Sequence, residues 1–276
     1  MPSKPRPRTA LVTGASAGIG RELVHQLTRD HGTVVLATAR RADRLQELVS
    51  ECPAGLVRTS AGDLNDSAFR AELWNQAEQL PGGCEVLFNN AGLGYYGPLK
   101  GQSLESLERE VETNVIALID LTRMALGSMT ARGQGQIVQI ASVLGVFGIP
   151  ESSVYVATKH AVLGLVRSLP GEVHGTGVRV WAACPGRTAS EFASVAAGRH
   201  ATLRRERAAE PTERVVRGIL AGLDRRSVIW FPTWRAWVLA KTATWLSWPF
   251  DHLLKNWQPN YVSDEPQKTL EQTGKC

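Results

Sequence analysis

Seven short apolar segments recur along the chain and are separated by longer amphipathic segments. The apolar segments span residues 9–12, 33–39, 56–61, 85–88, 136–141, 178–183 and 227–231. Their length and their β-branched residues predict buried strands. Helical periodicity between them is clearest over residues 20–30, 66–80 and 104–131. Apolar strands that alternate with helices predict an α/β fold, a Rossmann-type doubly wound, seven-stranded parallel sheet with helices on both faces.

The C-terminal part of the chain departs from this repeating pattern. Six of the eight tryptophans lie between Trp230 and Trp257, and Pro232 and Pro249 bracket a predicted helix. We therefore expect a disordered basic arm (1–8), one Rossmann-type domain (9–231) and a Trp-rich helical extension (232–276). Tryptophan combines an apolar ring with one polar N–H group. The extension is then a helix packed on the domain, an apolar lid over a substrate, or a contact with a membrane surface over residues 232–257.

The formal net charge of +5 is concentrated in one stretch of the chain. Residues 199–241 carry ten lysines and arginines against four acidic residues. A solvated helical face, an anionic substrate or an anionic membrane surface would each suit this excess, whereas no nucleic-acid-binding motif accompanies it. The four scattered cysteines predict free thiols. With no apolar signal segment and no uncharged apolar run of ~18–20 residues, we expect a cytoplasmic protein, at most peripheral to a membrane.

A glycine-rich turn follows the first predicted strand. It reads Thr-Gly-Ala-Ser-Ala-Gly-Ile-Gly from position 13 to position 20 and opens an amphipathic helix. Gly14 permits a tight turn out of the strand, and Gly18 and Gly20 allow close approach of a pyrophosphate and close packing of the helix. The helix N-terminus adds unpaired N–H groups and a partial positive charge. This context predicts a dinucleotide-binding loop, with Gly14, Ser16, Gly18, Ile19 and Gly20 as cofactor contacts.

Two arginines follow the second predicted strand. An acidic residue at this position binds the 2′-hydroxyl of NAD, whereas an arginine accommodates the 2′-phosphate of NADP. Arg40 and Arg41 stand here, and the next acidic residue is Asp43. A guanidinium binds phosphate through two parallel hydrogen bonds. We therefore expect NADP(H) rather than NAD(H) and no metal ion; the alternative is that both arginines only cap a surface turn.

Tyr155 and Lys159 form the candidate proton-transfer pair. They are four residues apart and so share one face of a helix. Carbonyl reduction needs a proton at the oxygen as hydride arrives, and the ordinary tyrosine pKa of ~10 is too high for efficient exchange near neutrality. An ammonium ~5–6 Å away favours the phenolate by roughly 3 kcal/mol, which would lower the pKa of Tyr155 by about two units. Ser142 follows the predicted strand 136–141, where it can hold the substrate oxygen.

The order and spacing of these motifs resemble the short-chain dehydrogenase/reductase family. The resemblance covers about residues 9–190 and adds two motifs, Asn89-Asn90-Ala91-Gly92 and Asn114. It implies hydride transfer between a nicotinamide and a carbonyl or alcohol carbon. It also implies a catalytic set of Asn114, Ser142, Tyr155 and Lys159, in which Asn114 fixes a water that links Lys159 to solvent.

The same resemblance assigns further cofactor contacts outside the glycine-rich turn and the two arginines. These residues are Asp63, Leu64, Asn90, Ala91, Gly92, Tyr155, Lys159, Pro185, Gly186, Thr188 and Ser190. By the resemblance, Asp63 binds the adenine amino group, and the turn at Pro185 and Gly186 packs on the nicotinamide. Thr188 stands where the family commonly has a small apolar β-branched residue. Ser190 stands where it usually has threonine, and its hydroxyl is expected to keep the contact.

Together these observations predict an NADP(H)-dependent carbonyl reductase or alcohol dehydrogenase. We expect an apolar substrate, lipid-, steroid- or retinoid-like, because the apolar tail follows the variable region after Ser190. A reductase of small polar ketones and a catalytically silent NADP-binding regulator are the alternatives. The family commonly assembles through the helix that starts near Tyr155, so a homo-oligomer, dimer or tetramer, is expected. Pro170 falls inside that helix and should kink it.

Overall fold

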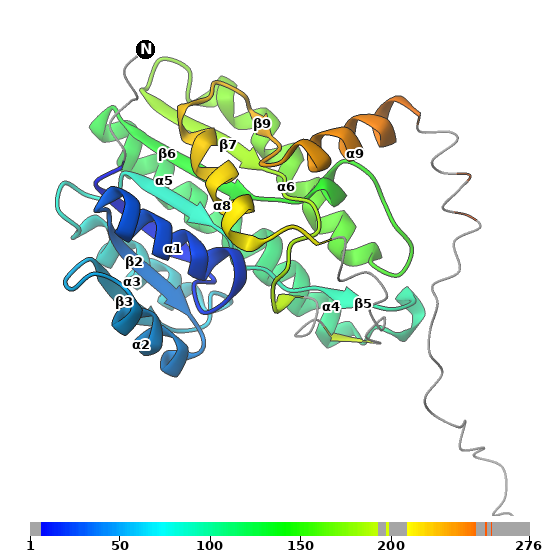
Figure 1. The fold of residues 1–276 in the computed structure, drawn as a ribbon, viewed down its shortest axis with the longest axis horizontal. Coiled ribbons are helices and arrows are strands. Elements are labelled where there is room, and N and C mark those ends of the chain that lie inside the picture. Colours follow the sequence, from blue (N-terminus) through cyan, green and yellow to red (C-terminus); the bar gives the residue numbers. More distant parts are fainter. Residues whose placement is uncertain (1–6, 193–196, 199–208, 247–251, 253–254, 256–276) are drawn as a thin grey trace, which may run out of the picture.

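A seven-stranded parallel sheet forms the centre of the molecule (Figure 1). The computed structural model describes residues 7–192, 197–198, 209–246, 252 and 255. The strands are β1 (Thr9–Thr13), β2 (Val34–Ala39), β3 (Val57–Ala61), β4 (Val86–Asn89), β6 (Gly135–Ile140), β7 (Val178–Ala183) and β9 (Ile229–Trp230). Their order is β3-β2-β1-β4-β6-β7-β9, and each neighbouring pair is parallel. The predicted doubly wound sheet is confirmed, and its order reverses between β1 and β4.

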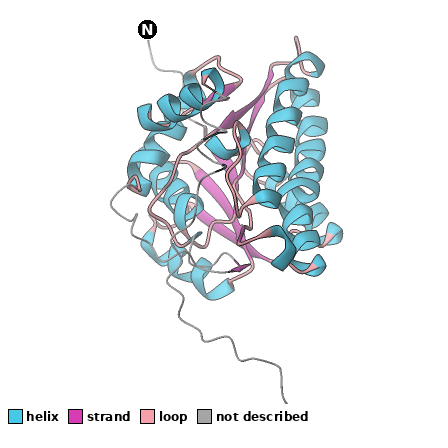
Figure 2. Cartoon of the chain, turned by 90° about the vertical axis from the view of Figure 1, so that its right-hand side faces the viewer, coloured by secondary structure: helices cyan, strands magenta, loops and turns pink. Residues whose placement is uncertain are grey.

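Helices cover both faces of the sheet (Figure 2). One layer contains α1 (Gly18–His31), α2 (Ala42–Glu51) and α8 (Thr212–Ala221), and the other contains α3 (Ser67–Glu78), α5 (Ala117–Arg132) and α6 (Ser153–Glu172). In β1, Ala10 and Val12 join the core under the first layer, whereas Leu11 joins the core under the second. Successive strand side chains point to opposite faces, so a strand covered on both faces is apolar throughout.

The helix expected over residues 104–131 is interrupted by a wider turn. It consists of α4 (Leu104–Val111), a π-helical turn η2 (Glu112–Ile116) and α5. A π turn contains one more residue per hydrogen-bonded ring than an α-helix, and a 3.6-residue hydrophobic period does not reveal it. Asn114 lies within this turn.

Several short elements lie outside the predicted set. They are the parallel pair β5 (Tyr95–Tyr96) and β8 (Ala197–Gly198), and the helical turns η1 (Leu99–Gly101), η3 (Val143–Gly145) and η5 (Gly222–Asp224). The pairing of β5 with β8 joins the chain after β4 to the chain after β7. Two-residue strands are too short to leave a periodic signal in a sequence.

α6 runs through Pro170 and ends two residues later, at Glu172. Proline removes one donor from the helical hydrogen-bond ladder, and here the missing bond falls in the last turn. The helix that contains Tyr155 is therefore continuous across this proline. The homo-oligomer stays a prediction.

α9 (Trp234–Trp245) is the described helix of the Trp-rich extension. Its N-terminus is capped by Thr233, whose Oγ1 accepts a hydrogen bond from the backbone N–H of Ala236 at 3.3 Å. The buried residues of α9 are the alanines Ala236, Ala240 and Ala243. Its exposed tryptophans are Trp234, Trp237 and Trp245, of which Trp245 is 79% exposed. Small side chains therefore hold this helix on the domain, while its tryptophans face outward.

Parts of the predicted arm, basic stretch and extension lie outside the described residues. These parts are residues 1–6, 199–208, 247–251, 253–254 and 256–276, which include Trp248 and Trp257. Among the residues that are described, no helix combines the length and the apolar character needed to cross a membrane.

Candidate active site

The turn between β1 and α1 requires glycine at three positions. Gly14 and Gly18 have φ values of 67° and 54°, which residues with a Cβ rarely adopt. A Cβ on Gly20 would lie 2.3 Å from the carbonyl oxygen of Gly14, so a larger residue would force the turn apart. Ala17 at the N-cap has no side-chain acceptor, which leaves the first N–H groups of α1 to an anion. Ile19 packs against the core. This cradle fits the pyrophosphate of a dinucleotide.

Thr13, the last residue of β1, joins this turn to the end of β4. Its Oγ1 accepts hydrogen bonds from the backbone N–H groups of Asn90 and Ala91, both at 2.9 Å. The Asn90 side-chain amide donates to the carbonyl oxygens of Thr13 and Gly14 at 2.9 and 3.3 Å. The turn and the segment that follows β4 thus form one surface where the strand order reverses. Thr13 had no predicted role, although it precedes the first glycine directly.

Arg41 and Ser190 border the same turn from distant parts of the chain. Arg41 Nη2 donates to Ser16 Oγ at 3.1 Å, and Arg41 Nη1 lies 3.6 Å from Glu191 Oε2. The Cβ of Ser190 lies 3.0 Å from the position that a Cβ on Gly18 would take. The structure therefore brings the predicted contacts Ser16, Arg41 and Ser190 together around the phosphate cradle.

Two predicted contacts on the ribose and adenine side are Arg40, which is exposed, and Asp63, which is half-buried. Arg40 follows β2 directly and is exposed. Asp63, which follows β3 by two residues, forms an ion pair of 3.5 Å with Arg109 of α4. The described residues place both side chains at the carboxyl edge of the sheet, where nucleotides bind in such folds.

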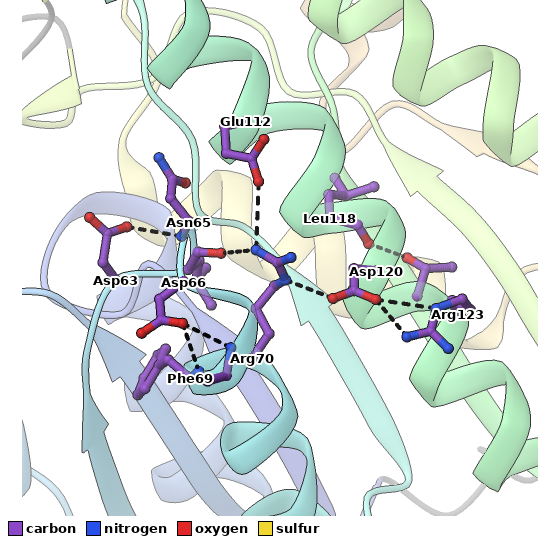
Figure 3. A network of polar contacts seen from close by, with 12 residues as sticks. Asp63, Asn65, Asp66, Phe69, Arg70, Glu112, Leu118, Asp120 and Arg123 are labelled. Carbon is purple, nitrogen blue, oxygen red and sulfur yellow. Dashed lines mark hydrogen bonds and ion pairs between the residues drawn. The ribbon is translucent and has the colours of Figure 1, made fainter.

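A buried arginine supports the segment that contains Asp63 and Leu64 (Figure 3). Arg70 is 6% exposed. Its Nη1 donates to the carbonyl oxygen of Leu64 at 2.7 Å, and its Nε donates to Asp120 Oδ2 at 2.7 Å. Glu112 of the π turn lies 3.7 Å from the same guanidinium. Arg70 thereby links α3, the segment after β3 and the start of α5.

Tyr155, Lys159 and Ser142 converge at the carboxyl end of β6. Lys159 Nζ lies 5.5 Å from the centroid of the Tyr155 ring and donates to the carbonyl oxygen of Ile140 at 3.0 Å. Ser142 lies close enough to Tyr155 to favour its phenolate, and its Oγ accepts a hydrogen bond from the backbone N–H of Leu144 at 3.1 Å. A hydroxyl, a phenol and an amine therefore meet where a carbonyl oxygen could be held and protonated.

Burial dominates the ionisation of this pair. Burial raises the pKa of Tyr155, and Tyr96 raises it further, while Ser142 acts in the opposite direction. Burial also lowers the pKa of Lys159 to about 8. Burial thus moves the pKa of Tyr155 in the direction opposite to the lowering expected from Lys159.

Asn114 anchors the segment beside Tyr155. The side chain is fully buried; its Oδ1 accepts from the N–H of Leu93 at 2.7 Å, and its Nδ2 donates to the carbonyl oxygen of Leu93 at 2.9 Å. Nδ2 also reaches Thr158 Oγ1 at 3.1 Å. A Cβ on Gly92 would lie 3.3 Å from Asn114 Oδ1 and 3.8 Å from Lys159 Nζ. These groups are thus neighbours, and the water-fixing role of Asn114 stays a prediction.

The segment after β7 borders the site on its other side. The N–H of Val143 donates to the carbonyl oxygen of Pro185 at 3.0 Å, which joins this segment to η3. Thr188 Oγ1 donates to the carbonyl oxygen of Gly186 at 3.2 Å. A Cβ on Gly186 would lie 3.6 Å from the Cβ of Ala236, so α9 packs against the turn that was predicted to face the nicotinamide.

Aromatic rings flank Tyr155 on this side. The ring centroid of Phe192 lies 5.5 Å from that of Tyr155. A Cβ on Gly94 would lie 3.1 Å from Phe192 Cζ and 3.6 Å from Tyr155 Cδ2, so glycine lets the loop approach both rings. Tyr96 of β5 is half-buried, and burial raises its pKa. The walls near the phenol are therefore largely apolar.

Comparison with known proteins decides the family. A family model described as short chain dehydrogenase matches residues 8–199. The chain belongs to the short-chain dehydrogenase family. Retinol dehydrogenase 8 of Homo sapiens is 34% identical over 188 residues, which is 67% of this chain and 60% of that protein. Farnesol dehydrogenase of Aedes aegypti is 34% identical over 210 residues, which is 72% of this chain and 85% of that protein.

Solved structures extend the likeness of this short-chain dehydrogenase to the whole fold. A short-chain dehydrogenase from Sphingobium yanoikuyae in complex with NADPH has a TM-score of 0.76 and 28% identity, over 95% of this chain and 100% of that chain. The predicted family and Rossmann-type fold are confirmed. Matches to several curated relatives nevertheless span less than two thirds of the relatives' own length.

Sequence reasoning missed three residues of this short-chain dehydrogenase that the structure places around the site. Arg70 and Phe192 left no usable signal, because each acts across segments that are distant in the sequence. Glu110, in contrast, did leave a signal in the sequence. It stands three residues after Leu107 and four before Asn114, a spacing that puts a carboxyl on the inward face of a helix.

Proposed function

We propose that the protein is an NADP(H)-dependent oxidoreductase that transfers a hydride between the nicotinamide and the carbonyl or secondary-alcohol carbon of an apolar substrate. The convergence of Tyr155, Lys159 and Ser142 beside a glycine cradle carries the proposal. Membership of the family supports it, since relatives bear the names retinol dehydrogenase and farnesol dehydrogenase.

In this mechanism the bound cofactor supplies the hydride for reduction and accepts it in oxidation. Ser142 Oγ holds the substrate oxygen beside the Tyr155 hydroxyl. Tyr155 donates its proton to that oxygen in reduction and removes it in oxidation. Lys159, whose pKa of about 8 keeps it largely protonated at neutral pH, stabilises the phenolate that results. Asn114 holds the Leu93 backbone, which borders the pair.

The arginines at the end of β2 support NADP(H) over NAD(H). Arg41 already reaches Ser16 of the phosphate cradle, so its guanidinium lies beside the turn that would receive the cofactor. Arg40 is exposed next to it. A carboxylate, which would bind a ribose 2′-hydroxyl, does not stand at this strand end. A 2′-phosphate would find two cations here.

Aromatic residues beside the phenol support an apolar substrate. Phe192 and the half-buried Tyr96 offer apolar surface next to Tyr155, and such surface stabilises bound apolar groups in proportion to the area that is buried. Retinol and farnesol, in the names of two relatives, are apolar alcohols. Small polar ketones are the alternative substrates.

A cofactor-depletion screen tests the proposed function. NADPH and NADH would each be assayed against ketones and aldehydes of increasing apolar size. We expect turnover with NADPH to exceed that with NADH, and kcat/KM to rise by roughly fourfold for each buried methylene. A preference for small charged ketones would reject the apolar substrate. Cofactor binding without turnover of any compound would favour a silent regulator.

We also propose that α9 contacts a membrane surface. Its exposed tryptophans lie beside cations, with Arg235 Cζ 5.7 Å from the Trp234 ring and Lys241 Nζ 6.0 Å from the Trp245 ring. Such pairs suit an anionic lipid interface. The full chain should float with anionic vesicles, whereas a chain lacking residues 232–276 should not. If the full chain does not float, this contact is rejected, and the helix is then a lid or a packing element only.

A further inference from the structure

Glu110 is a buried carboxyl near the proposed catalytic pair that the mechanism does not use. It lies on α4 and is 2% exposed. Its Oε2 accepts a hydrogen bond from Gln102 Nε2 at 2.9 Å, and its Oε1 is buried without a hydrogen-bond partner among the described residues. A buried carboxylate without full compensation is costly. Ordinary packing at this position would be better served by an apolar side chain.

The charged neighbours of Glu110 are the groups of the proposed reaction. From α6, Lys159 and Tyr155 interact electrostatically with the carboxyl, and from β5, Tyr96 does so. Arg109, the adjacent residue on α4, is engaged with Asp63 instead. Among the described residues Glu110 has no ion-pair partner within 4 Å, and the cation that favours its ionised form is Lys159.

Asn114 and Glu110 lie beside two successive parts of one segment. Asn114 binds the backbone of Leu93 through both its amide atoms, and the Glu110 carboxylate is favoured by the backbone N–H of Tyr95. Gly94 lies between these anchors, and a Cβ there would reach Tyr155 Cδ2 at 3.6 Å. The spacing of four residues places both anchors on the same side of the α4–η2 helix.

We propose that Glu110 is a positioning residue for the proposed hydride transfer, which holds the segment 94–96 against Tyr155 and supplies the negative charge that balances Lys159. This inference rests on the proposed function. The ionised carboxyl favours the ammonium of Lys159 and disfavours the phenolate of Tyr155. The protonated carboxyl does neither, so the state of Glu110 should govern how readily Tyr155 gives up its proton.

The sign of the effect follows from these interactions. Burial raises the pKa of Glu110 above its usual value, and the hydrogen bond from Gln102 opposes that shift. Glu110→Gln removes the charge and keeps the shape. Below the pKa of Glu110 both proteins carry a neutral group and should behave alike. Above it, the variant lacks the charge that disfavours the phenolate, so alcohol oxidation on the acidic limb of its pH profile should be faster.

The test compares the pH profile of kcat for alcohol oxidation in the wild type and in Glu110→Gln. The ratio of variant to wild-type rate should start near one in acid, rise to roughly tenfold, and return toward one where Tyr155 is ionised in both. Glu108→Gln, an exposed carboxyl on the same helix, should leave the profile unchanged. A ratio that is constant with pH would mean a structural role only and would overturn the proposal.

A second measurement does not depend on turnover. The pKa of Lys159, read from the carbon resonances of labelled lysine and assigned with Lys159→Arg, should fall below about 8 in Glu110→Gln. Gln102→Leu removes the donor to Oε2 and should move the rise of the rate ratio to higher pH. An unchanged pKa of Lys159 would overturn the inference even if the chain proves active. Absence of turnover in the wild type would instead overturn the proposed function.

Discussion

The two sides of the carboxyl edge of this sheet are held together by different kinds of contact. On the cofactor side, the side chains of Thr13 and Asn90 bond to backbone groups at the ends of adjacent strands, with hydrogen bonds of 2.9–3.3 Å. On the substrate side, Phe192 approaches Tyr155 as one ring against another, and α9 rests on alanines. Hydrogen bonds from side chains to the backbone fix the path of the chain, whereas contacts between side chains depend on the size and shape of both residues. We therefore expect cofactor binding to depend on the path of the chain around the turn, and substrate choice to depend on the side chains beside Tyr155.

Tyr155→Phe is expected to have the largest effect, and it should act on turnover and not on cofactor binding. Loss of the phenolic hydroxyl removes the proton donor, so kcat should fall by roughly 10²–10⁴-fold. Binding of NADPH, measured by fluorescence titration, should stay within about threefold of the wild type, because the glycine cradle is untouched. Tyr95→Phe offers a control on a neighbouring half-buried tyrosine. Unchanged turnover in Tyr155→Phe would reject its assignment as proton donor.

Arg70→Ala should break the support of the cofactor side. The substitution removes the hydrogen bonds to Leu64 and Asp120, and we expect the free energy of unfolding to fall by about 2–3 kcal/mol. The measurement is urea denaturation. Arg123→Ala is the matched control, because Arg123 also pairs with Asp120 but is 72% exposed, and it should lose less than about 1 kcal/mol. Equal losses in the two variants would contradict this ranking.

The loss in Arg70→Ala should also depend on pH. Burial raises the pKa of Asp120, but hydrogen bonds from Arg70 and Arg123 outweigh that effect and leave it below its usual value of 3.8. The ionised carboxylate therefore stabilises the fold above that pH, and this contribution is lost as the pH falls through the folded-state pKa. The difference in stability between wild type and Arg70→Ala should shrink below about pH 4.

Arg41→Ala should have the smallest effect, because we expect it to change only the preference for NADPH over NADH. Removal of one charge-assisted contact to a 2′-phosphate should weaken NADPH binding by roughly tenfold or somewhat more. NADH binding should change little. Arg44→Ala is the control, because Arg44 lies on α2, three residues after Arg41, and pairs with Glu47. Equal weakening for both cofactors would show that Arg41 serves the turn through Ser16 rather than the phosphate.

The seven strands and the glycine-rich turn could be predicted because backbone geometry dictates their residues. Gly14 has a positive φ, and a Cβ on Gly20 would lie 2.3 Å from the carbonyl oxygen of Gly14. Ala10, Leu11 and Val12 are all apolar because β1 packs against a core on each face of the sheet. The raised pKa of Tyr155 could not be predicted, because it depends on how deeply the helix is buried. The orientation of α9 could not be predicted either, because alanine and tryptophan both count as apolar in a periodic pattern.

The π turn at η2 has a consequence for the spacing of the chain on either side of it. Each residue of a helix advances the side chain by about 100°, so the extra residue of the turn rotates α4 against α5 by that amount. Removing any one residue from η2 would restore the plain helical phase and would rotate α4 about its axis, away from its present contacts with the site. The number of residues in η2 therefore matters more than the identity of their side chains. We expect an insertion or a deletion here to be more damaging than a substitution.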